Sequence, residues 1–364
     1  MHPNNFRSKS TNVCATICFL TNYTIVKLKF NIMYVVESYP LAVILCFVTM
    51  LCWGSWANTQ KLASKSWGFQ LFYWDYTLGV VLLSLIFGLT IGSNGEAGQA
   101  FMPNLSEATI KAIILALLGG IIFNLANLLL VAAIEIAGMA IAFPIGIGIA
   151  LSQGVVLNYM ASPVGNPFYI FSGVGLVMLA IVIDAIAYKR ISSGTTTKKG
   201  ILISLAAGIL MGFFFRFVAA SMSEDFSNPV KGFLTPYSAM FIFSVGIFLS
   251  NFLFNTFFMY KPINSNKVTY ADYFKKGTPK LHMIGLLGGI IWSIGMILSL
   301  IASGKAGFAI SYGLGQGATM IAAIWGVFVW KEFKMAPKGT NVLIAFMFGF
   351  FILGLGLIIF SRIA

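Results

Sequence analysis

The sequence predicts an all-α integral membrane protein whose ten transmembrane helices form two inverted five-helix repeats. Composition carries the first part of this prediction: 59% of the 364 residues are hydrophobic and only 9% are charged, with a mean hydropathy of +0.90. A water-soluble domain of this size needs charge over most of its surface, so lipid must be the solvent for most of the chain. A gapless internal repeat carries the second part.

Ten apolar runs follow one another along the chain, each close to the roughly 20 residues that a helix needs to cross a bilayer. Short connections rich in Gly, Pro, Ser and Asn separate them and leave no room for a soluble domain. The runs cover residues 40–62, 71–92, 109–133, 138–160, 167–188, 200–222, 235–260, 280–303, 306–330 and 341–361.

Lysine and arginine set the direction of these spans. The loops after spans one, five, seven and nine hold fourteen of them, whereas the opposite side, beyond residue 32, holds only Lys111, Lys231, Lys305 and Arg362. The positive-inside rule then places the lysine-rich loops in the cytoplasm and both termini outside. Because the basic residues are scattered between apolar runs, the net charge of +13 indicates orientation in the cytoplasmic membrane and excludes a nucleic-acid surface.

The first 32 residues depart from this pattern. The apolar stretch VCATICFL is too short to span a bilayer, and four basic residues would lie on the wrong side, namely Arg7, Lys9, Lys27 and Lys29. We therefore expect translation to begin at Met33 and residues 1–32 to be an extension, the alternative being a disordered tail.

The internal repeat predicts the architecture. Residues 117–148 and 286–317 align without a gap at an offset of 169, with LLGGII in both segments and AGMAIAFPIGIG matched to AGFAISYGLGQG. Spans three and four therefore recur as spans eight and nine, which predicts five-helix repeats over residues 33–190 and 191–364. Since five is odd, the second repeat must be inverted, an arrangement typical of alternating-access transporters.

The repeat also predicts interrupted helices at matching positions, which mark midplane substrate sites in such transporters. Proline removes a backbone hydrogen bond and glycine weakens a helix by about 1 kcal/mol, so both spans should be weakened at one level. Close packing of small residues is the equally weighted alternative. The residues concerned are Pro144, Gly146 and Gly148 in span four and Gly313, Gly315 and Gly317 in span nine.

Asp75 and Arg216 are the two charged residues most clearly inside spans. A charge within the bilayer usually faces a cavity or a partner. We expect Asp75 to accept a coupling proton and Arg216 to line the substrate cavity. The alternatives are interfacial anchoring or a structural salt bridge for Asp75, and a structural pairing with an acid or with backbone carbonyls for Arg216. Asp184 and Glu135 lie near span ends, where we expect ordinary boundary charges.

Aromatic and polar side chains complete the predicted substrate-binding set. Flat aromatic walls with amide donors and acceptors suit a neutral, planar, hydrogen-bonding small molecule. Interfacial belts and interhelical hydrogen bonds are the alternatives. Besides Arg216, the set is Trp53, Trp56, Asn124, Asn127, Trp292, Ser293, Tyr312 and Gln316.

Several absences narrow the chemistry. The chain has no GxxxxGK[ST] loop for ATP and no HExxH or GxSxG motif, and its two histidines and four cysteines form no metal-binding pattern. We expect no cofactor and no metal. In the absence of motifs for ATP-driven transport and metal chemistry, we expect a secondary transporter driven by a proton or sodium gradient. The composition does not indicate an oligomeric state.

Particular motifs resemble those of a known family. The ten-span plan and a Trp-Lys-Glu motif after span nine resemble those of the drug/metabolite transporter superfamily; the motif is Trp330, Lys331 and Glu332. Within this superfamily, the chain resembles the ureide permeases from about residue 33 to the C-terminus. The motifs that carry this resemblance are MYVVES from Met33, the GSW that follows, the DY at Asp75, LTPYSAMFIFSVGIF, FMYKPI and FVWKE.

This resemblance implies proton-coupled import of oxo-heterocycles such as allantoin or of nucleobases such as uracil. The long hydrophilic loop between spans five and six of plant members is reduced here to about a dozen residues. Glucose or rhamnose importers and multidrug or metabolite exporters of the same superfamily are the alternatives. An intramembrane enzyme is the alternative from another class, but no GxGD-type motif accompanies the aspartates.

Overall fold

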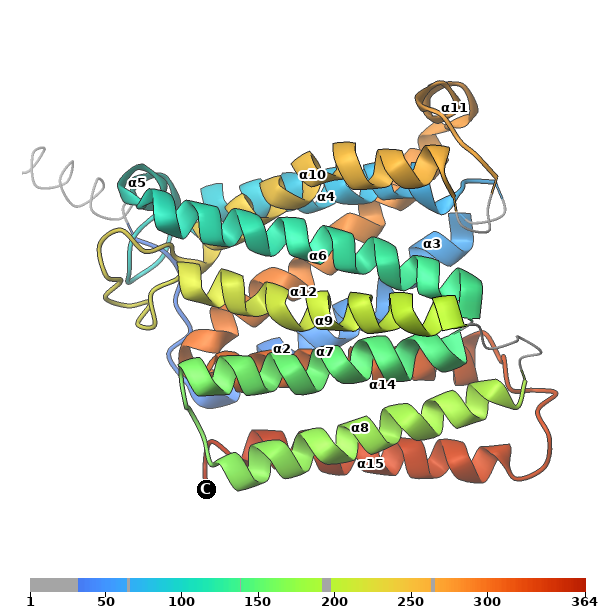
Figure 1. Cartoon of the computed structure of the whole chain (residues 1–364). Helices are drawn as coiled ribbons and strands as arrows, with labels where there is room; N and C mark the ends of the chain where they lie inside the picture. The colour runs from blue at the N-terminus through green and yellow to red at the C-terminus, as the bar shows by residue number, and fades with distance from the viewer. Residues whose placement is uncertain (1–31, 64–65, 138, 192–197, 263–265) are drawn as a thin grey trace, which may run out of the picture.

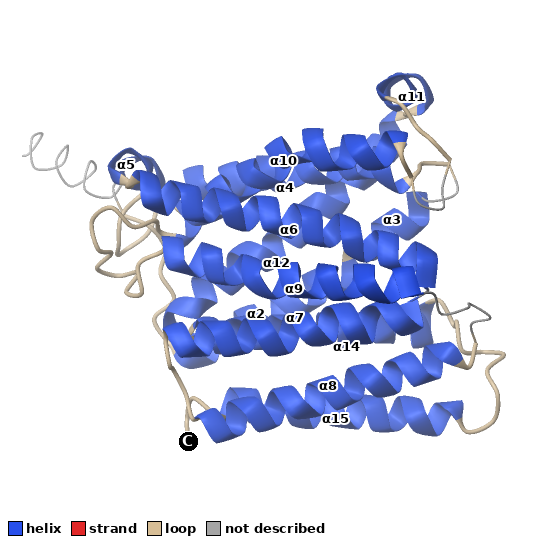
Figure 2. Cartoon of the chain, in the orientation of Figure 1, coloured by secondary structure: helices blue, strands red, loops and turns tan. Residues whose placement is uncertain are grey.

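The computed structural model describes residues 32–63, 66–137, 139–191, 198–262 and 266–364. Residues 1–31 of the expected extension lie outside this part of the chain. Within this part of the chain, every secondary-structure element is a helix, apart from two isolated β-bridges. The prediction of an all-α protein is confirmed (Figure 2).

Ten helical stretches are long and apolar enough to cross a bilayer, as the apolar runs predict. Two of them consist of more than one helix, and two short helices lie in connections. The helices are α2 (Tyr39–Ser55), α3 (Ala57–Ala63), α4 (Phe69–Leu89), α5 (Phe101–Glu107), α6 (Ile110–Ala137), α7 (Met139–Ala161), α8 (Pro167–Lys189), α9 (Lys198–Ser221), α10 (Pro236–Tyr260), α11 (Tyr270–Lys276), α12 (Pro279–Ala306), α13 (Phe308–Gly315), α14 (Ala318–Ile324), the π-helical turn η1 (Trp325–Val329) and α15 (Thr340–Phe360).

Polar residues followed by proline mark several helix starts. Asn166 precedes Pro167 and accepts a hydrogen bond from Phe168 N at 3.0 Å. Thr278 precedes Pro279 in the same way at α12. Proline is tolerated in the first helical turn because its missing N–H has no intrahelical partner there, so these pairs fix where the spans begin.

The spans lie side by side with their ends at two levels (Figure 1). α6 packs against α9 and α10, α12 packs against α4 and α2, and α8 pairs with α15. We call the end that carries α11 and the lysine-rich loops the basic end. The opposite end carries α5 and the C-terminus (Figure 1).

Glycines allow two close helix crossings. A Cβ at Gly120 of α6 would collide with the backbone oxygen of Phe243 in α10. A Cβ at Gly289 of α12 would likewise collide with the backbone oxygen of Tyr76 in α4. Both glycines belong to the repeated LLGGII segment, so the repeat encodes helix packing by small residues.

Two spans are interrupted, span one toward its basic end and span nine near its middle. Span one changes from α2 to α3 at Trp56, and span nine changes from α13 to α14 at Gln316 and Gly317. The two breaks meet, because a Cβ at Gly54 would contact Ala318 O at 2.5 Å. The predicted interruption of span nine is therefore present, and it faces an interruption in span one that the sequence reading missed.

Span four differs from the prediction. α7 continues through Pro144, Gly146 and Gly148 without an interruption. A Cβ at Gly208 of α9 would lie 2.6 Å from Gly146 O, so this level of α7 packs closely against α9. The glycines of this part of α7 therefore serve close helix packing, which was the alternative to an interrupted helix.

Candidate functional site

Two adjoining cavities extend from the basic end to the middle of the bundle. The vestibule has a volume of about 420 Å³, and the inner cavity has a volume of about 170 Å³. Trp56, Asn127 and Thr319 line both cavities, so the two are neighbouring parts of one void. The two helix breaks supply much of this shared wall.

Aromatic rings form the wall of the inner cavity. Trp53 and Trp292 stack with their ring centroids 6.0 Å apart and an interplanar angle of 11°. Phe123 lies 4.6 Å from Trp292, and all three side chains line the inner cavity. Gly315 makes room for this wall, because a Cβ there would lie 2.8 Å from the Trp53 ring.

Two amides line the inner cavity with unused hydrogen-bonding capacity. Asn127 donates from Nδ2 to Tyr73 Oη at 3.1 Å, and its Oδ1 accepts from no residue that the structure describes. Gln316 is buried, and its side-chain amide makes no hydrogen bond within the described chain. Buried amides are normally satisfied, so these groups are available to a ligand.

Buried aromatic side chains separate the inner cavity from the opposite end. Phe214 lies 5.9 Å from Phe243 and 6.2 Å from Tyr312, centroid to centroid. All three rings are buried: Phe214 and Phe243 come from the halves of α9 and α10 nearest the opposite end, and Tyr312 comes from α13, the part of span nine that starts at that end. The void is therefore open toward the basic end and closed on the other side.

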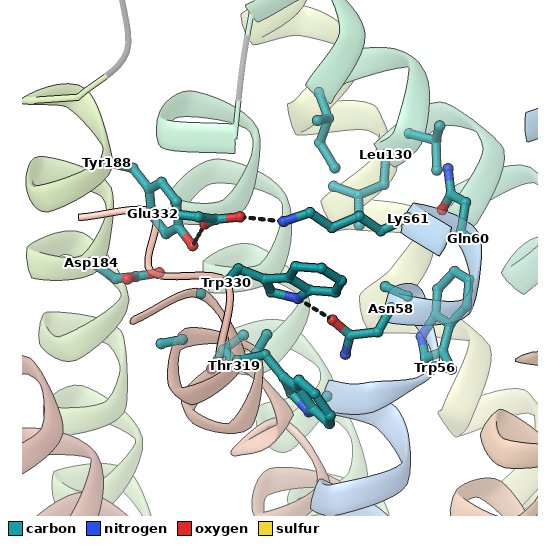
Figure 3. Close-up of a pocket in the computed structure, with 18 of the residues that line it drawn as sticks. Trp56, Asn58, Gln60, Lys61, Leu130, Asp184, Tyr188, Thr319, Trp330 and Glu332 are labelled. Carbon is teal, nitrogen blue, oxygen red and sulfur yellow. Dashed lines mark hydrogen bonds and ion pairs between the residues drawn. The ribbon is translucent and has the colours of Figure 1, made fainter. Parts of the chain in front are cut away.

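A polar network crosses the vestibule (Figure 3). Lys61 Nζ of α3 forms an ion pair with Glu332 Oε1 at 2.6 Å, and Tyr188 of α8 donates to Glu332 Oε2 at 2.9 Å. Trp330 donates to Asn58 Oδ1 at 2.6 Å, and Lys61 Nζ lies 4.2 Å from the Trp330 ring centroid. These contacts join the ends of spans one, five and nine.

Asp184 of α8 also lines the vestibule (Figure 3). The residue is 9% exposed, and it makes no hydrogen bond or ion pair with any described residue. The expectation of an ordinary boundary charge is wrong, because α15 and α7 cover this part of α8.

Asp75 lies on a different flank, in what we call the flank cluster: Asp75, Tyr273, His282 and Trp67. Asp75 is 3% exposed, accepts a hydrogen bond from Tyr273 Oη at 2.5 Å, and has both carboxylate oxygens 3.0 Å from His282 Nδ1. Trp67 packs edge-on against His282. Asp75 lines neither cavity.

The short helix α11 holds Tyr273 in the flank cluster. A capping box between Thr269 and Asp272 starts this helix. Hydrogen bonds from Lys276 and Thr269 lower the pKa of Asp272 to about 2. Burial, and then the bond to Asp75, raise the pKa of the Tyr273 phenol.

The remaining predicted binding residues do not line either cavity. Asn124 donates to Ser250 Oγ at 2.9 Å, and Ser293 donates to Val80 O at 3.4 Å, so both join neighbouring helices. Tyr312 donates to backbone carbonyls of α7 and α9. Arg216, near the opposite end of α9, makes no hydrogen bond or ion pair with a described residue.

Five predicted binding residues therefore meet at one wall, while the sequence reading missed most of the vestibule. The five residues are Trp53, Trp56, Asn127, Trp292 and Gln316. The missed residues are Asn58, Lys61, Asp184, Tyr188 and Thr319. The sequence did contain one signal for the vestibule. Glu332 and Trp330 belong to the Trp-Lys-Glu motif, which served only as support for the family resemblance.

Comparisons with known proteins agree with this architecture. The sequence model of a family described as ureide permease matches residues 72–199 and 187–361. Ureide permease 1 of Arabidopsis thaliana is 22% identical over 90% of this chain and 99% of its own length. A putative sugar uptake protein of Streptococcus agalactiae is 22% identical over 74% of this chain and 88% of its own length.

A solved crystal structure shares the fold, with a TM-score of 0.56 at 17% identity over 89% of this chain and 99% of the other. The family match covers nine of the ten spans found among the described residues, from Phe72 in span two onward, and leaves out span one with Trp53 and Trp56. The chain is a multi-pass membrane protein that belongs to the ureide permease family.

Proposed function

We propose that this chain is a secondary active transporter that imports a small polar metabolite, such as a ureide or a nucleobase, together with protons across the cytoplasmic membrane. Membership of a permease family supports transport of a small molecule. The related protein named ureide permease 1 supports the substrate class.

One observation carries the proposal: the Asn127 Oδ1 oxygen and the Gln316 side-chain amide, which have no hydrogen-bond partner in the described chain, belong to residues that line the same void as the stacked Trp53 and Trp292 rings. A planar heterocycle offers a flat face for such a wall and N–H and C=O groups for the amides. A charged ligand would suit this inner cavity poorly, since it has no charged side chain among its lining residues.

We propose the inverted arrangement of residues 33–190 and 191–364 as the basis of alternating access. The two glycine crossings support it, because Gly120 places α6 on α10 while Gly289, its counterpart in the repeat, places α12 on α4. The interrupted spans one and nine meet at the void, as broken helices do in transporters of this kind.

The basic end corresponds to the cytoplasm in this proposal, by the positive-inside rule. The conformation is then open to the cytoplasm, since the vestibule reaches Lys61 and Glu332, whose side chains are 44% and 30% exposed. The assignment of Asp75 as proton acceptor stays a prediction. Asp75 lines neither cavity, which counts against direct contact with substrate and leads to the competing assignment of this role to Asp184.

A sugar importer is the second candidate. The putative sugar uptake relative supports it, and so do the tryptophans, because sugars also pack against aromatic rings while bonding to amides. The two candidates differ in ligand shape, which binding measurements can separate.

The experiment is uptake into proteoliposomes that contain the purified protein, under an imposed pH or sodium gradient. Labelled allantoin, uracil, glucose and rhamnose are tested in parallel, with empty liposomes as the control. We expect accumulation of allantoin or uracil driven by the pH gradient. Accumulation of only the sugars would favour the second candidate, and no gradient-driven accumulation of any solute would contradict secondary transport.

A further inference from the structure

We propose that Asp184, in the wall of the vestibule, is the site that binds and releases the coupling proton. This inference rests on the proposed function and assigns its coupling step to one carboxyl group. Among the described side chains, Asp75 and Asp184 are the buried carboxyl groups near the basic end, and of the two Asp184 lines the void, together with Asn127.

The burial of Asp184 without a partner is the first argument. Its side chain lines the vestibule, is 9% exposed, and makes neither a hydrogen bond nor an ion pair with the described residues. An ionised carboxylate in such a place is costly unless water, a cation or a proton compensates it. The site is thus suited to gain and lose a proton.

The charged surroundings of Asp184 favour a proton over a fixed partner. Glu332 is the charged group that acts on Asp184, and both residues line the vestibule (Figure 3). Glu332 is itself held by Lys61 at 2.6 Å and by Tyr188 at 2.9 Å, so the single cation of the network is already paired with the other carboxylate. Two carboxylates near each other share a proton more readily than they both ionise.

The helices α15 and α7, which pack on α8, bring no further charge to Asp184. α15 carries no titratable side chain, and α7 carries only Tyr159, whose hydroxyl donates to Gly165 O near the opposite end. Lys189 and Arg190 finish α8 and are exposed. The loop that carries Glu332 and packs Phe333 on Tyr188 also carries Lys331 and Lys334, which are exposed. The side chain of Glu135 in α6 lies outside the described part of the chain.

A proton on Asp184 would couple to substrate through closure of the void. When the vestibule closes, the carboxyl loses the water that now reaches it, and the charged form becomes more costly. In the outward-facing state, an O–H bond forms on the carboxylate with a proton from hydronium. In the state described here, that bond breaks and water at the basic end accepts the proton.

The test uses the full-length protein in proteoliposomes at zero membrane potential, with two transport readouts. Exchange of labelled for unlabelled substrate needs no net proton movement, whereas accumulation under a pH gradient does. The variants are Asp184→Asn, Asp184→Glu, Asp75→Asn and, as a control on the exposed end of α5, Glu107→Gln.

At one proton per substrate, a gradient of one pH unit supports about ten-fold accumulation. We expect this value for the wild-type, Asp75→Asn and Glu107→Gln proteins. The Asp184→Asn protein should exchange substrate but equilibrate it without accumulation, and Asp184→Glu should restore accumulation. Wild-type accumulation in Asp184→Asn, or loss in Asp75→Asn alone, would overturn the inference while leaving the permease intact. Accumulation driven by sodium in place of protons would also overturn it.

A second readout does not depend on transport. Infrared spectroscopy of the purified proteins, titrated from alkaline to acidic pH, records the C=O stretch of protonated carboxyl groups. We expect Asp184→Asn to lose a titrating band that Asp75→Asn and Glu107→Gln retain. If no tested solute is exchanged by the wild type, the proposed function fails for those solutes, and this band still decides the inference: an unchanged band in Asp184→Asn overturns it.

Discussion

Asp184 and Asp75 are both buried carboxyl groups near the basic end, yet their surroundings are opposite. Asp75 accepts hydrogen bonds from Tyr273 and lies against His282, so its oxygens are satisfied within the flank cluster. Asp184 has no such partner among the described residues, and it lines the vestibule. A satisfied buried carboxylate stabilises the positions of its neighbours, whereas an unsatisfied one facing a void is available for exchange with solvent.

The same contrast separates the two aromatic clusters. Trp53 and Trp292 line the inner cavity, while Trp67 is fully buried against His282 and Tyr273. We therefore expect changes at the void to affect transport first, and changes in the flank cluster to affect stability first.

The largest expected effect is on ligand affinity at the void. Trp56→Ala removes a ring that lines both cavities. If the ligand stacks there, the substrate concentration that half-saturates exchange should rise roughly 5- to 150-fold. The reason is that stacking of a base on an aromatic ring contributes about 1–3 kcal/mol. The measurement is the concentration dependence of exchange. Phe346→Ala, on the exposed face of α15, is the matched control, and an equal effect of both changes would remove the distinction.

The next effect concerns stability in the flank cluster. Asp75→Asn weakens the bonds to Tyr273 and His282, which should lower unfolding free energy by about 1–3 kcal/mol. Thermal unfolding in detergent measures this loss, with Glu107→Gln as the control. An unchanged melting temperature, together with lost accumulation, would reverse the roles of the two carboxyl groups.

Tyr273→Phe tests the same cluster through pH. The pKa of the Tyr273 phenol is raised in the folded protein, chiefly by burial and then by Asp75. A raised pKa gives stability that is fully present below the unfolded value of about 10 and is lost as pH rises through the folded value. Tyr273→Phe should therefore cost about 1 kcal/mol at neutral pH and remove this alkaline loss.

Melting temperatures of the wild-type and Tyr273→Phe proteins, measured from neutral to strongly alkaline pH, check this prediction. The two curves should converge at high pH. Parallel curves would mean that folding does not raise the pKa of the Tyr273 phenol.

The smallest effect is expected in the polar network of the vestibule. Glu332→Gln breaks the ion pair with Lys61, both partners being partly exposed. Such pairs contribute about 0–1 kcal/mol, so the melting temperature should hardly change. A double-mutant cycle with Lys61→Gln measures the coupling. A coupling well above that range would make the network a structural centre comparable with the flank cluster.

The sequence predicted the ten spans well because apolar length is a local property. Predicted and observed boundaries differ by only a few residues, as in residues 167–188 against Pro167–Lys189. The break in span nine followed from Gly315 and Gly317. The break at Trp56 was missed because that stretch holds only one helix-weakening residue, Gly54.

The site was harder to predict because small rotations on a helix decide it. Asn124 and Asn127 are three residues apart, hence about 60° apart around the helix axis. One bonds to Ser250 between helices, and the other faces the cavity. Asp184 could not be assigned from sequence, since its setting depends on Glu332, which is far away along the chain.

The most direct test of the account is labelling of Thr319→Cys and His282→Cys, each in a background with the four native cysteines replaced by alanine. Thr319 lines both cavities, and His282, with a side chain 31% exposed, belongs to the flank cluster. A membrane-impermeant maleimide applied at the basic end should label both, and transported substrate should slow labelling of Thr319→Cys alone. Substrate protection of His282→Cys alone, or of neither, would contradict the claim that this void is the substrate path.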